Sequence, residues 1–234
     1  MATHRMAGTA HAFWGTKAAE YESLIRRTIP RYDEIVAILL ETVPAGCRNV
    51  LELGCGTGNL TLHLVERFPA AALTIVDAAP EMLEIAVART GATSPETAAR
   101  VTPVAARFED LVLEDGSFDA VVASFSLHHL PELAPLYRRA RTWLAAGGVL
   151  RTADAFAGPT PQLHTYYMER WTSYWREPGN LDDEEIRSMD EHVRAHDHYF
   201  DLAAHFRWLE AAGFSAYDCV WRDGLLGVLA AETA

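Results

Sequence analysis

The sequence contains few cysteines, and its basic residues are outnumbered by acidic ones. Its 234 residues include three cysteines, Cys47, Cys55 and Cys219, and no two of them form a C-x-x-C pair. This excludes a disulfide framework and is typical of the reducing cytoplasm. Lys and Arg total 20 against 32 Asp and Glu, which gives a formal net charge of -12 at pH 7. Nucleic acids and anionic membranes attract basic surfaces, so we expect neither as a partner.

Long apolar stretches are also absent. No segment approaches the ~20 apolar residues that a transmembrane helix needs, and the N-terminus lacks the apolar core of a secretory signal. We therefore expect a cytoplasmic protein. Hydrophobic residues make up 50% of the chain, which is enough for the core of one large α/β domain.

A glycine-rich stretch follows the first strong strand signal of the chain. Residues 49–53 favour a strand, Gly54, Gly56 and Gly58 alternate with small residues, and apolar residues from Leu60 onward have helical spacing. The pattern predicts a buried strand, a tight turn and the start of a helix. Such a turn lets the backbone approach a ligand closely, and the helix N-terminus offers N–H groups to it.

The spacing of these glycines distinguishes between nucleotide ligands. A dinucleotide fingerprint is G-x-G-x-x-G, but Asn59 occupies the position of its last glycine, which disfavours a dehydrogenase. The pattern G-x-G-x-G, with Glu52 two residues before Gly54, resembles motif I of the class I S-adenosylmethionine (SAM)-dependent methyltransferases. The resemblance implies that the turn lies against the methionine part of SAM and that S-adenosylhomocysteine is the product. It assigns Glu52, Gly54, Gly56 and Gly58 to the cofactor site.

An acidic residue further along the chain supports the same resemblance. Residues 73–77 are predicted to form the second strand, which ends at Asp77. A carboxylate at this tip can accept hydrogen bonds from both ribose hydroxyls. The run that starts at Ala78 is also similar to the family. The resemblance implies a Rossmann-like α/β fold, a doubly wound seven-stranded and mostly parallel sheet with N-terminal helices and a helical lid insertion.

We expect four parts within one domain. They are an N-terminal helical lid over residues 1–44, a SAM-binding core over 45–155, a helical substrate cap over 156–200, and the last helix with a terminal β-hairpin over 201–234.

The end of the core contains a helix signal followed by glycines. Residues 131–145 are predicted to form a helix that Gly147 and Gly148 close, and residues 149–153 are predicted to form the fifth strand.

The N-terminal part carries a second, weaker resemblance. Residues 27–32, R-T-I-P-R-Y, are similar to the helix junction before motif I in carboxy-SAM synthases. In those enzymes this region folds over SAM, and its Arg and Tyr line the active site. Tyr21, Arg27 and Tyr32 are therefore candidate cofactor contacts. The alternative is that the tyrosines are core aromatics with hydrated hydroxyl groups.

Further cofactor contacts are expected after the third and fourth strands. In the family, the loop after the third strand holds adenine through an apolar side chain and polar contacts. Many members have Asp where this sequence has Arg107, which leaves Glu109, Asp110 or a backbone group to meet the adenine, and we rank Phe108 and Glu109 first. We also place Ser124, which follows the fourth strand, beside the cofactor.

A histidine pair follows Ser124 in a region that resembles motif IV of the family, where the chain leaves the strand beside the transferable methyl group. His128 is the candidate general base, because an unperturbed imidazole titrates near pH ~6.5. His129 is a candidate substrate contact. The alternative is that one of the pair only caps the next helix or packs beneath it.

The insertion after the fifth strand is rich in aromatic residues. Tyr166 and Trp171 are candidate substrate contacts, because aromatic lining suits an apolar or planar substrate. The same rings also suit a homodimer contact or an ordinary core.

The second half of the insertion is rich in histidine. His196 is a second catalytic candidate and His198 a substrate contact, with a solvated helix end as the alternative. His192 and His196 share a helix face, but their H-x-x-x-H spacing lacks the Glu of a zinc-protease helix. We therefore expect no metal.

These signals together predict a SAM-dependent methyltransferase that acts on a small-molecule acceptor, at an O, N or C atom that the residues do not distinguish. The alternatives are an enzyme like a carboxy-SAM synthase, a SAM enzyme that modifies a macromolecule, and a SAM-binding protein without catalysis.

Overall fold

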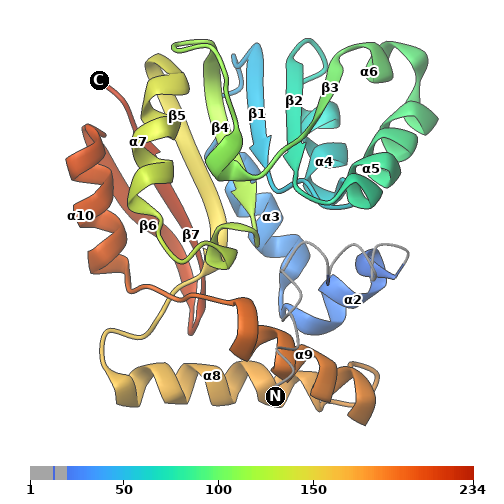
Figure 1. The fold of residues 1–234 in the computed structure, drawn as a ribbon, viewed down its shortest axis with the longest axis vertical. Coiled ribbons are helices and arrows are strands. Elements are labelled where there is room, and N and C mark those ends of the chain that lie inside the picture. The colour runs from blue at the N-terminus through green and yellow to red at the C-terminus, as the bar shows by residue number, and fades with distance from the viewer. Residues whose placement is uncertain (1–12, 14–19) are drawn as a thin grey trace, which may run out of the picture.

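The computed structural model describes residues 13 and 20–234, and its centre is one seven-stranded sheet (Figure 1). The strand order is β3-β2-β1-β4-β5-β7-β6. The strands are β1 (Asn49–Leu53), β2 (Ala72–Asp77), β3 (Val101–Ala105), β4 (Phe118–Ser124), β5 (Leu144–Ala155), β6 (Ala216–Asp223) and β7 (Leu226–Glu232).

The sheet is mostly parallel, as the sequence predicts. Strands β1 to β5 pair in parallel, whereas β7 pairs antiparallel with both β5 and β6. The chain moves from β1 outward to β2 and β3, then returns to place β4 on the other side of β1. The carboxyl ends of β1 and β4 therefore flank the point where the winding reverses, which is where open α/β sheets bind ligands.

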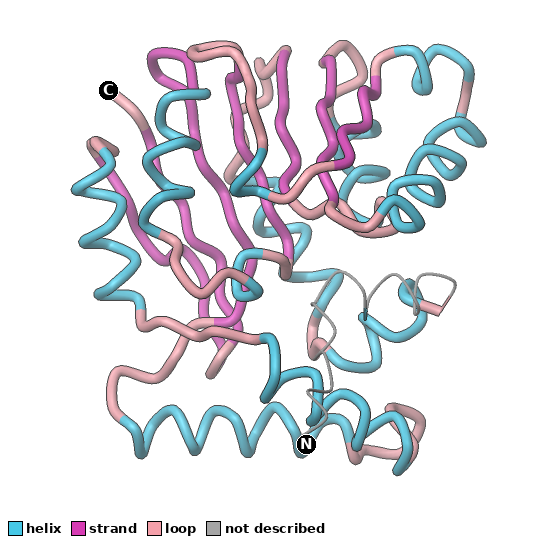
Figure 2. The backbone as a smooth tube through the Cα atoms, in the orientation of Figure 1, coloured by secondary structure: helices cyan, strands magenta, loops and turns pink. Residues whose placement is uncertain are grey.

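Helices cover both faces of the sheet (Figure 2). Alternate strand residues point to opposite faces, so Val50 belongs to one hydrophobic core and Leu51 to the other. The first core is shared with α3, α4 and α5, and the second with α7 and α10. Their bounds are α3 (Tyr32–Glu41), α4 (Asn59–Arg67), α5 (Pro80–Thr93), α7 (Ala134–Trp143) and α10 (Leu202–Ala212), and the short α6 (Pro95–Ala99) follows α5.

Three further helices, α2 (Tyr21–Thr28), α8 (Pro161–Trp175) and α9 (Asp183–His196), lie below the sheet in Figure 1, past the carboxyl ends of β1 and β4. The indole Nε1 atoms of Trp171 and Trp175 both donate to the carbonyl of Thr28, at 2.7 and 3.0 Å. These bonds join α8 to the end of α2. Of the lid predicted for residues 1–44, residues 1–12 and 14–19 lie outside the described part of the chain.

The predicted helix over residues 131–145 is wrong in its bounds. The helix α7 ends at Trp143 and the chain passes directly into β5, which contains both Gly147 and Gly148. The pairing of β4 with β5 shifts register between Phe118 and Ala120. Gly147 has φ 71°, and a Cβ on Gly148 would lie 2.9 Å from a backbone oxygen. The glycines therefore form a bulge-like irregularity in the strand and not a helix cap.

The C-terminal elements match their predictions. Asp201 caps α10, with its Oδ1 accepting a hydrogen bond from the backbone N–H of Ala204 at 2.7 Å. Gly213 ends the helix at φ 91°, and β6 and β7 form the terminal hairpin. Among the described residues, no helix combines the length and the apolar character needed to cross a membrane.

Candidate functional site

A cavity of about 300 Å³ lies at the carboxyl ends of β1, β2 and β4. Its described lining has two ends. The glycine end consists of Tyr21, Gly54, Gly56, Asp77, Ala78, Met82, Arg107, Phe108 and Glu109. The histidine end consists of Phe125, Ser126, His129, Leu130, Pro131, Ala195, His196 and His198.

The three glycines of the turn after β1 serve different purposes. All have positive φ values, 71°, 53° and 85° for Gly54, Gly56 and Gly58, a conformation that favours glycine. A Cβ on Gly54 would lie 2.3 Å from that of Ser126, and one on Gly58 would lie 3.1 Å from α5, so these glycines permit close packing. A Cβ on Gly56 would approach only the ring of Tyr21 among the described residues, at 3.5 Å. The missing side chain of Gly56 thus leaves room inside the cavity.

Asp77 connects the tip of β2 to the glycine turn. Its Oδ2 accepts a hydrogen bond from the backbone N–H of Gly56 at 2.8 Å, and its Oδ1 accepts one from the N–H of Ala79 at 2.9 Å. Each carboxylate oxygen can accept more than one hydrogen bond. The side chain lines the cavity and is therefore placed to accept bonds from a pair of ligand hydroxyls.

The loop after β3 forms the wall next to Asp77. Phe108 and Glu109 begin a short 3₁₀ turn, and both line the cavity. Arg139 donates to both of their carbonyl oxygens at 2.8 Å, which fixes the turn. Arg107, the residue that departs from the family pattern, pairs with the Glu109 carboxylate at 3.0 Å.

Glu52 and Ser124 lie behind the lining formed by the described residues, although the sequence predicts cofactor contacts for both. Glu52 is 1% exposed, and its Oε2 accepts a hydrogen bond from the Thr61 hydroxyl at 2.6 Å. The pKa of Glu52 is raised to about 8, mainly by burial; the Thr61 hydrogen bond lowers it and the charge of the nearby Asp77 raises it. At neutral pH the Glu52 carboxyl is therefore mostly protonated, and it joins β1 to α4.

The three candidates in the N-terminal helices separate in the structure. Tyr21 lines the cavity. Tyr32 is 6% exposed and packs against Phe125, with ring centroids 5.9 Å apart, so it matches the core-aromatic alternative. Arg27 lies outside the described lining because its guanidinium makes a bidentate ion pair with Glu185, at 2.8 Å for both bonds. Arg27 therefore connects α2 to α9.

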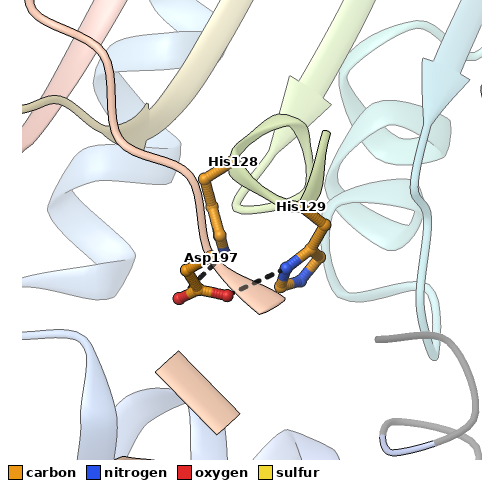
Figure 3. Close-up of side chains that lie close together, drawn as sticks. All are labelled: His128, His129 and Asp197. Atoms are coloured by element: carbon orange, nitrogen blue, oxygen red, sulfur yellow. Dashed lines mark hydrogen bonds and ion pairs between the residues drawn. The ribbon is translucent and has the colours of Figure 1, made fainter. Parts of the chain in front are cut away.

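His128 lies between two buried carboxylates and not among the described lining residues. Its Nδ1 is 2.5 Å from Asp154 Oδ1. Its Nε2 is 3.8 Å from Asp197 Oδ2, a contact that Figure 3 shows. Burial alone would lower the pKa of His128, but the charges of Asp154 and Asp197 outweigh it and raise the pKa to about 9. An imidazole that is already protonated at neutral pH does not fit the general base that the sequence predicts.

His129, the next residue, does face the cavity. Its Nδ1 is 3.1 Å from Asp197 Oδ1 (Figure 3). The hydroxyl of Tyr199 donates to Asp197 Oδ2 at 2.6 Å. Burial, and then the charge of His128, lower the pKa of His129. His129 is therefore a neutral imidazole at neutral pH, held in orientation by Asp197.

The residues predicted from the insertion also separate. His196 and His198 line the histidine end of the cavity, and the backbone N–H of His198 donates to the carbonyl of His128 at 2.7 Å. Tyr166 is 53% exposed on α8, and Trp171 is buried against Thr28. Neither ring belongs to the described lining of the cavity, so the substrate contacts predicted for them are not supported by their placement.

Several lining or supporting residues have no strong local signal. Asp154 and Asp197 both contact the His128 imidazole, although the two residues are 43 positions apart in the sequence. The sequence indicates a site position for Asp154 only through its place at the end of the fifth strand, which pairs in parallel with β4. Phe125 has φ 51°, which is strained for a residue other than glycine, and it lines the cavity directly after β4. Such strain is often found at functional sites.

The chain is similar to known methyltransferases and to a carboxy-S-adenosyl-L-methionine synthase. Residues 50–148 match the family model described as a methyltransferase domain. A carboxy-S-adenosyl-L-methionine synthase from Chromohalobacter salexigens is 29% identical over 204 residues, which cover 83% of this chain and 73% of the synthase. A ubiquinone biosynthesis O-methyltransferase from Xanthomonas axonopodis is 37% identical over 131 residues, which cover 53% of this chain. The match spans about half of that enzyme, 51%.

The fold is similar to that of solved methyltransferases. A Thermotoga maritima structure, described as a SAM-dependent methyltransferase and possible histamine N-methyltransferase, superposes with a TM-score of 0.67 at 16% identity. The superposition covers 95% of this chain and 99% of that chain. At this identity the likeness concerns the fold alone.

Proposed function

From the premise that the chain is a class I SAM-dependent methyltransferase, we propose that it transfers the SAM methyl group to a small-molecule acceptor at the histidine end of the cavity. The observation that carries this proposal is the continuity of one cavity from the glycine turn and Asp77 to His129, His196 and His198. Cofactor and acceptor would thus meet inside a single cavity.

The glycine end has the chemistry that SAM requires. Gly56 lacks a side chain where the methionine part would lie, Asp77 offers carboxylate oxygens to the ribose, and Phe108 offers an apolar face to adenine. Glu109 lies beside Phe108 and can accept a hydrogen bond from the adenine amino group.

The histidine end suits a small polar acceptor. The whole cavity has a volume of about 300 Å³, at the lower limit of ligand pockets. The end of α9 and the segment after it close the histidine end with Ala195, His196 and His198. Imidazoles can donate or accept hydrogen bonds, so His129, His196 and His198 would orient the acceptor in line with the methyl group. The acceptor lone pair then forms the bond to the methyl carbon while the carbon–sulfur bond breaks and its electron pair stays on sulfur. Alignment of this kind supplies much of the acceleration.

The alternative of a carboxy-SAM synthase receives less support from the site. The Arg of the N-terminal stretch that resembles those synthases is Arg27, and it is bound to Glu185 outside the described cavity lining. Arg27 therefore does not take the place at the active site that the resemblance implies.

The three cysteines, Cys47, Cys55 and Cys219, are free thiols, and on this basis we also propose a cytoplasmic location. The acidic charge of -12 supports a small-molecule acceptor over nucleic acid or an anionic membrane.

A metabolite extract incubated with methyl-labelled SAM tests the proposal. We expect the label to move to a small extractable compound, and no transfer with the Gly56→Val variant. Label that stays on a heavier SAM derivative would indicate synthase chemistry, and label on protein or RNA would indicate a macromolecular acceptor. Tight SAM binding without any transfer would contradict catalysis.

A further inference from the structure

We propose that His128, His129 and Asp197 bind one divalent transition-metal ion beside the histidine end of the cavity. The three residues come from the 3₁₀ turn after β4, Leu127–His129, and from the segment that follows α9. One ligand atom from each lies within 4.8 Å of the other two, and Figure 3 shows the three side chains converging. The metal site rests on the proposed function in one respect: the ion would lie beside the methyl acceptor.

The distances between the ligand atoms are close to those around a bound ion. His129 Nδ1 lies 3.1 Å from Asp197 Oδ1, and His128 Nε2 lies 3.8 Å from Asp197 Oδ2. Nitrogen and oxygen ligands that surround zinc at ~2.1 Å are roughly 3.0–3.4 Å apart in octahedral or tetrahedral geometry. The His129–Asp197 distance is already in that range, and the His128–Asp197 distance would have to shorten by about 0.4 Å to reach it.

The groups around the three ligands match the supporting shell of protein metal sites. A histidine that binds a metal usually donates its other ring N–H to a carboxylate, and His128 Nδ1 is 2.5 Å from Asp154 Oδ1. Asp154 is itself held by the backbone N–H groups of Leu127 and Ala155, at 2.9 and 2.8 Å. Tyr199 donates to Asp197 at 2.6 Å. These bonds direct His128 Nε2 and the Asp197 carboxylate toward each other.

The local charge also favours a cation. The side chains of Asp154 and Asp197 are 4% and 3% exposed. Within the described residues, the ion pairs of these two carboxylates are made with histidines only, and neither Lys nor Arg takes part. Two buried carboxylates without permanent cations are costly. One divalent ion with neutral imidazoles would balance them.

Two histidines and one carboxylate leave coordination positions open. This ligand set is found in non-haem iron(II) enzymes and in catalytic zinc sites, and His129 lines the cavity, so an open position would face the acceptor. An acceptor hydroxyl bound there would lose its proton to solvent more readily, and its oxygen would then form the bond to the methyl carbon as the carbon–sulfur bond breaks. The acceptor class implied is a molecule with a hydroxyl or enol oxygen.

Metal binding can be measured on the full chain without an affinity tag, SAM or acceptor. We expect chelator-treated protein to bind one Co²⁺ or Zn²⁺ ion per chain, by calorimetry and elemental analysis, with cobalt absorption bands typical of nitrogen and oxygen ligands. His129→Ala and Asp197→Ala should raise the dissociation constant more than about 100-fold, and Asp154→Asn by about 10–100-fold. His63→Ala on α4, which removes a histidine that is not part of the cluster, should bind like wild type.

Circular dichroism and thermal unfolding establish that each variant is folded, and Asp154→Asn keeps the test usable where a ligand variant does not fold. A folded wild-type chain that binds no ion at millimolar metal would overturn the proposal, as would folded ligand variants that bind as tightly as wild type. Because SAM binding and methyl transfer are measured separately, either outcome leaves the proposed function to its own test.

Discussion

The backbone N–H of Gly56 donates a hydrogen bond to Oδ2 of Asp77 at 2.8 Å. This bond fixes the turn after β1 against the tip of β2, so the room left by Gly56 and the carboxylate of Asp77 belong to one preformed surface. The account of cofactor binding rests on this pair, and the first two predictions concern it.

Gly56→Val should abolish SAM binding. The new side chain would enter the cavity toward Tyr21, and φ 53° is strained for valine. Isothermal titration calorimetry on the folded variant measures the loss. Gly46→Val is the control. Gly46 is not among the glycines with positive φ, and no described atom lies within 4 Å of the position its Cβ would take. Wild-type affinity in folded Gly56→Val would show that SAM binds elsewhere.

Asp77→Ala should weaken SAM binding by roughly 1.5–3 kcal/mol, the scale of hydrogen bonds to a charged group. The variant loses both the expected ribose contacts and the bonds to the N–H groups of Gly56 and Ala79. Asp77→Asn keeps one acceptor oxygen, so its SAM affinity should lie between those of the wild type and Asp77→Ala. Titration calorimetry with SAM and with NAD checks this, and tighter binding of NAD than of SAM to the wild type would refute the assignment.

Glu52 should make the stability of the fold depend on pH. Its folded pKa of about 8 lies above the ~4.3 of an unfolded chain, so the folded state binds more protons between these values. The free energy of unfolding attributable to Glu52 therefore falls as pH rises from about 4 to 8. Asp77, Tyr32 and Cys55 are the titratable groups that interact with it.

Glu52→Gln lacks this titration. Urea unfolding at pH 5, 6.5 and 8.5 should show the wild type losing stability relative to the variant at each step. Parallel stability profiles would mean that the Glu52 carboxyl is ionised in the folded state throughout.

Arg27→Met should destabilise the fold by about 1–2 kcal/mol, because the bidentate pair with Glu185 is partly buried, with each side chain 27% exposed. Arg27→Met with Glu185→Gln should cost little more than either change alone. The exposed pair Arg194–Asp190 is the control, and its loss should change stability by less than about 0.5 kcal/mol. A large loss of SAM affinity in folded Arg27→Met, without loss of stability, would restore Arg27 to the cofactor site.

Local sequence was sufficient for the sheet and for the glycine end of the cavity. The strand at residues 49–53, the glycine turn and Asp77 are close in sequence or are joined by neighbouring parallel strands, and their chemistry depends on residue type. The role of Arg27 was not predictable, because its partner Glu185 is 158 positions away. Gly147 and Gly148 have the composition of a helix cap, and only pairing with β4 shows that they form a strand irregularity.

The histidine pair shows most clearly what could not be predicted from the sequence. His128 and His129 are adjacent, and the sequence cannot say which of them faces the cavity. The 3₁₀ turn Leu127–His129 decides this, because it directs His128 toward Asp154 and leaves His129 in the lining. Asp154 and Asp197, which set the orientation of the two rings, come from β5 and from the segment after α9.

A crystal structure of the chain with S-adenosylhomocysteine tests the central claim most directly, that one cavity holds the cofactor at the glycine end and the acceptor at the histidine end. We expect the ribose hydroxyls within hydrogen-bond distance of the Asp77 carboxylate, the adenine against Phe108, and the sulfur atom directed toward His129. S-adenosylhomocysteine bound outside this cavity, or bound with its sulfur facing away from the histidine end, would contradict the account.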